Sequence, residues 1–196
     1  AGSDGAFGWR LNAAASHLDP ATRNSRGGSH LVAAAAEWRL GNDALLEAEV
    51  ETNRQRQPST PGFSLLGDRL PDADRVDPRL NLNNQPWSLP VVFEGTTGSL
   101  RYTQPLAGDW QLVAHLMQQR LRTEDRIAFP FGCSAEDDYT RYCSDGSFDL
   151  YDFRSEGERR TTRAADIALQ GTATLAGIKH HLGLGLLRST HQARFQ

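Results

Sequence analysis

The residues with the greatest potential for chemistry are few and poorly placed for it. His180 and His181, preceded by Lys179, look most like a metal site. Adjacent side chains on a β-strand point to opposite faces, so on a strand these two imidazoles could not easily share one ion. Asp137 and Asp138 form an acidic pair of the calcium type, but no ligand-bearing loop pattern surrounds them. Because no Ser, His and acid combination fits a catalytic motif either, we predict no enzyme, no catalytic residue, no cofactor and no metal ligand.

Three acidic residues have a more informative spacing. Glu47, Glu49 and Glu51 occupy every second position. On a helix they would spread around the cylinder, whereas on a strand they line one face at intervals of roughly 6.6–6.8 Å. That interval is too wide for the three to hold one cation, so we predict a charged wall. The expected partners on neighbouring strands are Arg10, Arg39 and Arg101.

Aromatic side chains gather in the segments that connect the alternating stretches, beside Arg122, Arg126 and Arg141. Exposed rings of this kind can form the walls of a pocket for a partly apolar ligand. Alternatively, the rings only pack the connecting segments against each other, where several prolines would stiffen them. The candidate ligand-binding residues are Trp87, Phe93, Phe129, Phe131, Tyr139 and Tyr142.

The two cysteines, Cys133 and Cys143, lie close together in a polar stretch with many aromatic residues. Such a pair suits a disulfide in an oxidising compartment. The bridge would close a small loop, and its role would be structural. The alternative is two unrelated free thiols.

The elements that would position these residues show alternation of apolar and polar residues, which is typical of half-buried strands. Segments 44–55 and 161–175 have some helix-forming propensity, but the alternation argues against helices there. We predict about seven strands, each of roughly 9–11 residues, as needed to cross a bilayer at a tilt. The alternating segments are 7–16, 32–40, 46–51, 99–103, 110–117, 166–175 and 178–189.

Short and long connections alternate along the chain. The short ones, at 41–43, 107–109 and 176–177, are rich in turn-forming residues. The long ones run over about 19–29, 57–95 and 127–147. Outer-membrane barrels have this asymmetry, with short periplasmic turns and long extracellular loops. Aromatic residues on the apolar side near the short turns fit an interfacial girdle; they are Trp9, Trp38, Tyr102 and Trp110.

Composition agrees with an all-β transmembrane barrel segment. Only 38% of residues are hydrophobic and the mean hydropathy is -0.54, which a barrel with a polar interior tolerates. No apolar run approaches the roughly 20 residues of a membrane helix, so a membrane crossing would need strands. The net charge of -3 predicts no basic stripe and no nucleic-acid partner. No signal peptide is recognisable at Ala1, so we expect a mature protein or a start in mid-protein.

Several stretches resemble TonB-dependent siderophore receptors of the ferrichrome type. They are residues 61–67, 77–87, 126–133, 142–143 and 151–156. The resemblance implies an outer-membrane receptor that imports ferric siderophores, of the hydroxamate type, with energy supplied through TonB. The iron would arrive inside its siderophore, so that no protein ligand to the metal is needed. A family barrel has about 22 strands and a plug domain. Residues 1–196 would then be a partial barrel domain, without the plug through which TonB acts.

Two other classes of protein remain as alternatives. A complete small barrel acting as a porin, adhesin or outer-membrane hydrolase predicts an even number of strands and a terminal aromatic residue. The sequence disfavours it, because the chain ends at Phe195-Gln196 within a strand that has no further partner. A soluble β-sandwich that binds carbohydrate is a more distant alternative.

Overall fold

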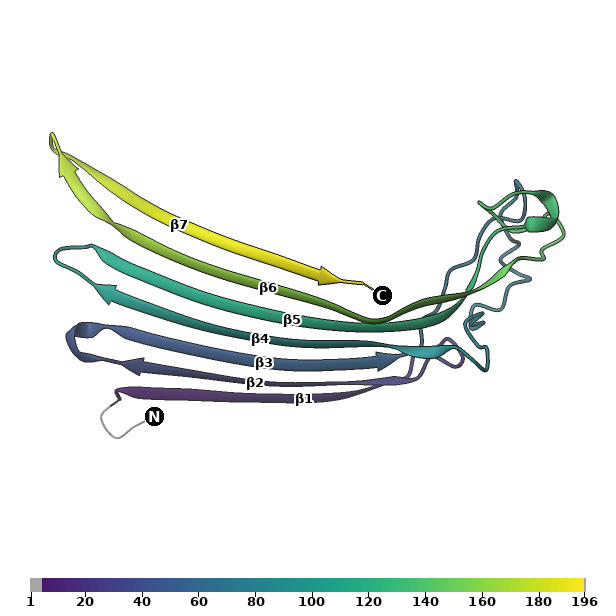
Figure 1. Cartoon of the computed structure of the whole chain (residues 1–196), viewed down its shortest axis with the longest axis horizontal. Helices are drawn as coiled ribbons and strands as arrows, with labels where there is room; N and C mark the ends of the chain where they lie inside the picture. Colours follow the sequence, from purple (N-terminus) through teal and green to yellow (C-terminus); the bar gives the residue numbers. More distant parts are fainter. Residues whose placement is uncertain (1–4, 196) are drawn as a thin grey trace.

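The computed structural model describes residues 5–195, which form one antiparallel sheet of seven strands (Figure 1). Each strand pairs with the next one along the chain, so the predicted all-β meander is confirmed. Two short 3-10 turns, Gly41–Asp43 and Ser134–Glu136, interrupt the connections. No helix in this part of the chain is long and apolar enough to span a bilayer. The strands are β1 (Phe7–Leu18), β2 (Gly27–Arg39), β3 (Leu45–Gln57), β4 (Leu89–Pro105), β5 (Gln111–Pro130), β6 (Leu150–Leu175) and β7 (Ile178–Arg194).

The strands are longer than predicted. They contain 12 to 26 residues rather than 9–11, and the extra length lies mainly in β5 and β6, with 20 and 26 residues. The long connections shrink accordingly to residues 19–26, 58–88 and 131–149. Directly beyond the apolar part of β5 and β6, at residues 118–126 and 154–163, nearly all residues are polar on both faces, so backbone pairing continues where the hydrophobic alternation has ended. As a consequence, Phe93 and Phe129 lie in strands and not in loops.

The short connections lie at one end of the sheet and the long ones at the other (Figure 1). Ala176 and Gly177 join β6 to β7 with φ of 51° and 79°, as in the two-residue turn that suits the twist of a hairpin. Asn42 and Asp43 also have positive φ, 59° and 56°, and are residue types that accept it at low cost. The predicted order of short and long connections is therefore confirmed.

Because directly paired residues share a face of the sheet, the register defines two faces. We call them the apolar face and the polar face. One row of paired residues on the apolar face consists of Trp38, Leu46, Tyr102, Ala114, Ile167 and Leu186. The adjacent row on the polar face consists of Glu37, Glu47, Arg101, His115, Asp166 and Leu187.

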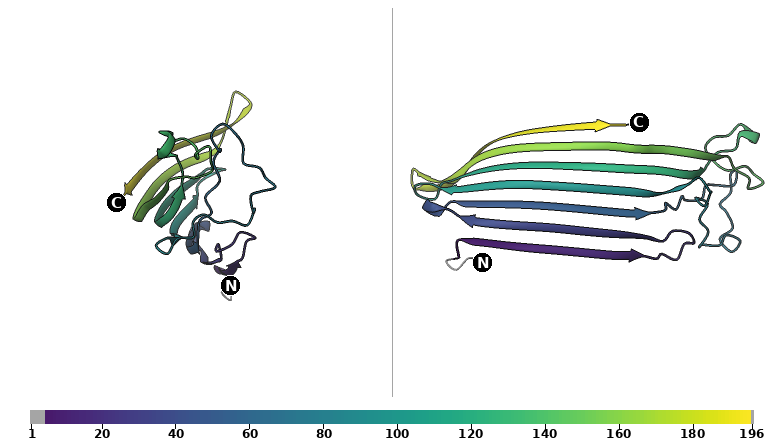
Figure 2. Two further views of the ribbon diagram at one scale, coloured as in Figure 1. Left: turned by 90° about the vertical axis from the view of Figure 1, so that its right-hand side faces the viewer. Right: turned by 60° about the horizontal axis from the view of Figure 1, so that its bottom comes forward.

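The apolar face is not covered by protein. Trp9 is 67% exposed and Leu184 is 75% exposed. Figure 2 shows a single curved layer of strands with no second sheet against it in the described part of the chain. Leu112 and Leu169 lie along this face with Leu184 and do not converge into an interior. The β-sandwich alternative requires a second sheet, which residues 5–195 do not form.

The apolar part of this face forms a band that crosses the strands obliquely. From β1 to β7 the first polar residue toward the loop end lies progressively closer to the short turns, although Thr52 pairs directly with Thr96 and Gln118 with Arg163. From β1 to β7 this boundary moves by about eight residues, which is roughly 27 Å along a strand for roughly 29 Å across the sheet. A band of constant height therefore requires strands inclined by about 43°, close to the tilt of barrel strands in membranes. The boundary residues are His17, His30, Thr52, Thr96, Gln118, Arg163 and Arg188.

The aromatic residues predicted for a girdle do lie on the apolar face toward the short turns. The strand register places Trp9, Trp38 and Tyr102 on this face. Trp110 lies over Gly171, since a Cβ atom on that glycine would be 2.4 Å from the Cδ2 atom of the indole. Gly171 thus leaves the space that the Trp110 ring fills, an arrangement known to support glycines in strands.

Replacing Gly171 by alanine tests this packing. We expect Gly171→Ala to lower the free energy of unfolding by about 1–3 kcal/mol, because the new methyl group must displace the Trp110 ring. The matched control is Gly183→Ala, where nothing lies within 4 Å of the added atom. Urea titrations of both variants measure the difference. Equal stabilities would contradict the packing of Trp110 on Gly171.

Candidate ligand-binding loops and the adjoining aromatic wall

Three connections form one body at the loop end of the sheet (Figure 2). The loop of residues 19–26 is attached to the loop of residues 58–88 through Arg23. The Arg23 guanidinium lies 2.7 Å from the Asp77 carboxylate, and its backbone N–H donates to the Arg79 carbonyl at 2.8 Å. Ser25, which is 1% exposed, accepts a hydrogen bond on its carbonyl from the Gln57 side chain at 3.0 Å.

The loops 58–88 and 131–149 are joined by backbone pairing. The Tyr142 N–H donates to the Leu65 carbonyl at 3.0 Å, and the Gly67 N–H donates to the Tyr142 carbonyl at 3.1 Å. Arg141 adds ion pairs with Asp68 and, at 2.6 Å, with Asp138. These contacts connect segments that are far apart in sequence, and they hold the two longest loops against each other.

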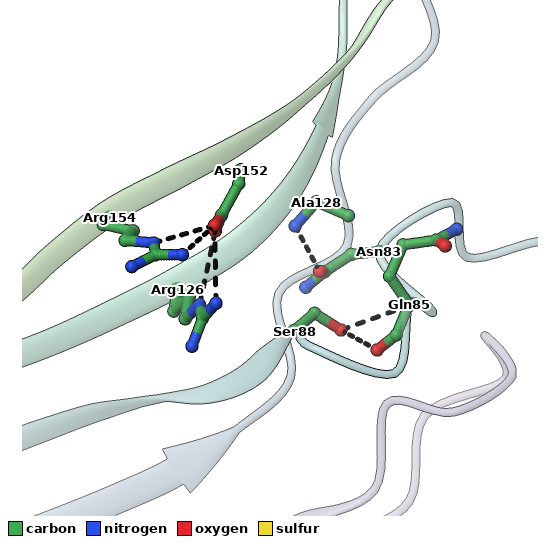
Figure 3. A network of polar contacts seen from close by, with 7 residues as sticks. All are labelled: Asn83, Gln85, Ser88, Arg126, Ala128, Asp152 and Arg154. Carbon is green, nitrogen blue, oxygen red and sulfur yellow. Dashed lines mark hydrogen bonds and ion pairs between the residues drawn. The ribbon is translucent and has the colours of Figure 1, made fainter.

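Asn83 attaches loop 58–88 to the sheet (Figure 3). Its side chain is almost fully buried, and its Oδ1 atom accepts a hydrogen bond from the Ala128 N–H at 2.8 Å. Its Nδ2 atom donates to the Ser59 carbonyl at 3.0 Å, and its N–H donates to the Asn81 side chain at 2.9 Å. Asn83 therefore satisfies a β5 backbone group in the region where strand β4 has ended.

The disulfide Cys133–Cys143 constrains loop 131–149. Both half-cystines are buried. Closing a loop of this size stabilises the folded protein by about 3 kcal/mol, because the bridge restricts the conformations of the unfolded chain. Glu136 lies near the two sulfur atoms, but disulfide sulfurs are not thiolates, and its carboxylate accepts hydrogen bonds from Ser144 at 2.9 and 3.1 Å. These three residues do not fit a metal centre.

The acidic pair considered as a calcium site has a different function in the loop. Asp138 accepts hydrogen bonds from the Thr140 hydroxyl and N–H at 2.7 and 2.8 Å. These bonds, together with the nearby Arg141, hold the pKa of the Asp138 carboxyl below its ordinary value. Asp138 is therefore an anionic turn residue that orders the loop.

Some of the candidate rings form a wall on the polar face near the loops. Phe129 and Phe93 are 39% and 51% exposed on this face. Tyr151 pairs directly with Phe129, and Phe153 pairs with Ile127, so both rings share that face. We define Phe93, Phe129, Tyr151 and Phe153 as the aromatic wall. Sequence reasoning missed Tyr151 and Phe153 as site residues, because the register shift that turns them to this face has no signal in their spacing.

The other candidate rings belong to the loops. Phe131 continues the wall, with its ring centroid 5.5 Å from that of Phe129. Tyr139 is 56% exposed in loop 131–149, and Trp87 is half-buried at the end of loop 58–88. Tyr142 is buried and its ring lies 5.1 Å from the Phe148 ring, so it packs inside the loop body.

Two of the arginines expected beside these rings lie elsewhere. Arg122 and Arg126 are on the apolar-face side of β5, where Arg126 contacts Asp152 at 3.3 Å (Figure 3). Asp152 also pairs with Arg154, and the two guanidinium groups, Arg154 first, hold the pKa of its carboxyl below the ordinary value. The prediction that Arg122 and Arg126 accompany the rings is wrong, because adjacent positions on a strand alternate between faces.

The polar face contains fewer contacts between charged side chains than predicted. Arg101 lies 3.9 Å from Glu47, and His115 lies 3.3 Å from Asp166. Arg10 and Arg39 share this face but form no ion pair within residues 5–195. His180 and His181 pair with Ala173 and Thr172 and so lie on opposite faces, as predicted.

Comparisons with known proteins identify the fold. No protein-family model matches the chain, and no curated protein matches it. Among solved structures, the siderophore receptor PiuA from Acinetobacter baumannii aligns over 97% of the chain with a TM-score of 0.80 at 10% identity. BauA, the ferric preacinetobactin receptor of the same species, aligns over 97% with a TM-score of 0.80 at 16% identity. The ferric-catecholate import receptor Fiu from E. coli K12 aligns over 95% with a TM-score of 0.75 at 15% identity.

The likeness covers only a part of those receptors. The chain spans 27%, 26% and 28% of the lengths of PiuA, BauA and Fiu. At these identities the shared property is the fold, a meander of strands as in the barrels of outer-membrane receptors. None of the three is described as a ferrichrome receptor, so the ferrichrome type is not supported by them.

The attachment of the loops through Asn83 can be tested by substitution. We expect Asn83→Ala to lower the free energy of unfolding of the loop end by about 1–3 kcal/mol, because the Ala128 N–H loses its buried acceptor. Hydrogen exchange at the Ala128 amide should accelerate in parallel. Asn84→Ala is the control, since Asn84 is exposed and adjacent in sequence. Unchanged exchange at Ala128 in Asn83→Ala would contradict the anchoring role.

Proposed function

We propose that this chain forms part of the barrel wall of an outer-membrane receptor that takes up ferric siderophores with energy supplied through TonB. The observation that carries the proposal is the oblique apolar band, with the linked loops beyond its upper edge. The fold that the chain shares with PiuA, BauA and Fiu supports it. The proposal places the short turns in the periplasm and the loop body outside the cell.

The exposed side chains require a non-aqueous partner. Burying one large apolar side chain stabilises by about 1.5–3 kcal/mol, and monomeric soluble proteins rarely leave patches larger than a few hundred Å² uncovered. Here the apolar face extends over all of the strands, and Leu184 and Leu186 are each 75% exposed. Hydrocarbon on this face and water on the polar face satisfy both sets of side chains.

The ligand would meet rings and not metal-binding side chains. In a closed barrel the polar face lines the interior, so the aromatic wall faces inward at the extracellular end, and Tyr139 lies in the loop body next to it. Such rings can hold the apolar parts of a chelate that encloses its own iron. Contact with TonB would be made by a plug, outside residues 1–196.

The membrane assignment predicts unequal effects of two similar substitutions. Leu184 and Leu187 are 75% and 71% exposed but lie on opposite faces. Leu184→Arg should cost about 2–4 kcal/mol at mid-membrane depth, whereas Leu187→Arg, facing the interior, should cost far less. Urea unfolding of the full-length protein from lipid vesicles measures both. Equal costs would contradict the face assignment.

Uptake of radioactive iron tests the transport function. The full-length protein is expressed in cells that lack their other ferric-siderophore receptors, and it is supplied with a ferric hydroxamate or a ferric catecholate. We expect uptake of one chelate, the hydroxamate from the sequence resemblance. Phe129→Ala and Phe153→Ala should each raise the apparent KM by about fivefold or more, as for aromatic contacts in interfaces.

The control for the uptake experiment is Phe7→Ala. Phe7 is 43% exposed, similar to the two wall residues, but it lies on the apolar face near the short turns. Its substitution should leave the KM unchanged. Uptake of neither chelate would overturn the import function, and uptake of the catecholate would overturn only the hydroxamate assignment.

A further inference from the structure

One carboxylate beside the aromatic wall has no counter-charge. Asp125 lies on β5 in the polar-face row between Thr123 and Ile127, and it pairs with Ser155 of β6. The residue is half-buried, and its Oδ1 atom is buried without a hydrogen-bond partner among residues 5–195. No arginine, lysine or histidine in that range forms an ion pair with it. Polar groups in this condition are concentrated at functional sites, where a ligand supplies the partner.

The neighbouring donors serve a second carboxylate instead. Glu158 accepts hydrogen bonds from the Thr123 hydroxyl at 3.3 Å and from the Ser155 hydroxyl. The Arg160 guanidinium lies 2.8 Å from the Glu158 carboxylate. Burial and, after it, the negative charge of Glu158 raise the pKa of the Asp125 carboxyl above its ordinary value. A cation at Asp125 would oppose both effects, because it replaces lost hydration and offsets the repulsion.

Asp125 lies between two rings of the aromatic wall. Phe93 pairs directly with Thr123, and Phe153 pairs directly with Ile127, so each ring is a diagonal neighbour of Asp125 on the same face. Diagonal neighbours in an antiparallel sheet are about 7–8 Å apart, which is within reach of aromatic side chains. The faces of aromatic rings attract cations, and a carboxylate among them adds a full opposite charge. This combination fits an ammonium group carried on an apolar stem.

The charges at the extracellular side of the wall have the same sign. Ten acids outnumber six arginines in the loop body, which comprises residues 19–26, 58–88 and 131–149. The excess lies in the last of these loops, which has five acids, and its single arginine, Arg141, is already engaged in ion pairs. This loop continues directly into the wall, where the Tyr151 hydroxyl donates to Asp149 at 3.5 Å. An excess of one charge raises the local concentration of ligands of the opposite charge.

The arginines that could attract an anionic chelate to the wall are turned away or engaged. Arg126 and Arg154 contact Asp152 on the opposite face of the sheet (Figure 3). Arg160 shares the polar face, but Glu158 holds it at 2.8 Å. On the polar face of β4, β5 and β6, which carry the wall, the described part of the chain therefore has an unpaired carboxylate and no unpaired arginine.

We propose that Asp125 binds an ammonium group of the ferric chelate, so that the receptor prefers a positively charged hydroxamate over neutral and anionic chelates. The inference rests on the proposed function and names the charge of the ligand that the aromatic wall receives. The iron-binding part of the chelate lies on the rings, and its amine tail reaches Asp125 between Phe93 and Phe153. The ammonium N–H groups donate to the carboxylate and so give the buried oxygen its partner.

Binding of two matched chelates by the full-length protein tests the proposal. Ferrioxamine B is a linear ferric trihydroxamate with a free terminal amine, and acetylation of that amine removes the charge without altering the iron site. Quenching of tryptophan fluorescence in detergent at neutral pH measures both dissociation constants. We expect the form with the free amine to bind about tenfold more tightly or better, as for a hydrogen bond between charged groups.

Asp125→Asn should remove this preference. The substitution should weaken binding of ferrioxamine B by about tenfold and leave binding of the acetylated form unchanged. It keeps the shape of the side chain and ends the repulsion from Glu158, so the urea midpoint of unfolding should not fall. Asp166→Asn is the matched control, because it removes the same charge from the same face nearer the short turns. The control should keep the preference of the unaltered protein.

Three results would overturn the proposal. The first is equal affinity of the unaltered protein for the two chelates. The second is an equal loss of affinity for both chelates in Asp125→Asn, which would show a general effect on the wall. The third is an equal loss of the preference in Asp166→Asn, which would show an effect of net charge alone.

The outcomes separate this inference from the transport function. Uptake of both forms of ferrioxamine B with equal affinity would refute the ammonium site and leave the import function intact. Uptake of a ferric catecholate alone would refute the ammonium site and the hydroxamate assignment, but not import. Failure to take up any of the three chelates would refute both the inference and the import function.

Discussion

Every other feature of this molecule depends on an apolar face that the chain itself does not cover. Backbone pairing satisfies the hydrogen bonds between neighbouring strands, but it leaves residues such as Trp9 and Leu184 with no protein partner. A soluble fold would place a second layer there. In the proposed membrane orientation hydrocarbon replaces that layer, and because a bilayer has a fixed height, the apolar band fixes the inclination of the strands. The inclination then determines which residues of each strand lie at the headgroups and which extend beyond them.

This constraint explains how far the sequence could predict the fold. Apolar and polar side chains alternate only in the part of each strand that carries the apolar face, so the number of strands and their order were predictable. Beyond Gln118 on β5 and before Arg163 on β6 the alternation ends, although backbone pairing continues as far as Pro130 and Leu150. Strand length was underestimated for this reason, and Phe93 and Phe129 were assigned to loops.

The faces of the candidate site could not be predicted from spacing alone. Counting from Ile167 along β6, alternation places Tyr151 and Phe153 on the apolar face. The register between β5 and β6 shifts between Thr123 and Asp125, where two residues of β6 oppose one of β5, and Gly157 in this stretch has a φ of 76°. Such a bulge inverts the faces of all residues beyond it. It thereby turns Tyr151 and Phe153 toward the side of Phe129 and completes the aromatic wall.

The net charge of the chain hides a separation of charges between the two faces of the sheet. The overall value of -3 sums two populations that the sheet keeps apart. Acids such as Glu47, Glu49 and Asp166 lie on the polar face, whereas Arg122, Arg159 and Arg163 lie on the opposite side. In a soluble domain both populations would share one solvent, and their sum would describe the field that a partner meets. In the proposed membrane orientation the two faces meet different surroundings, so each face has a charge of its own.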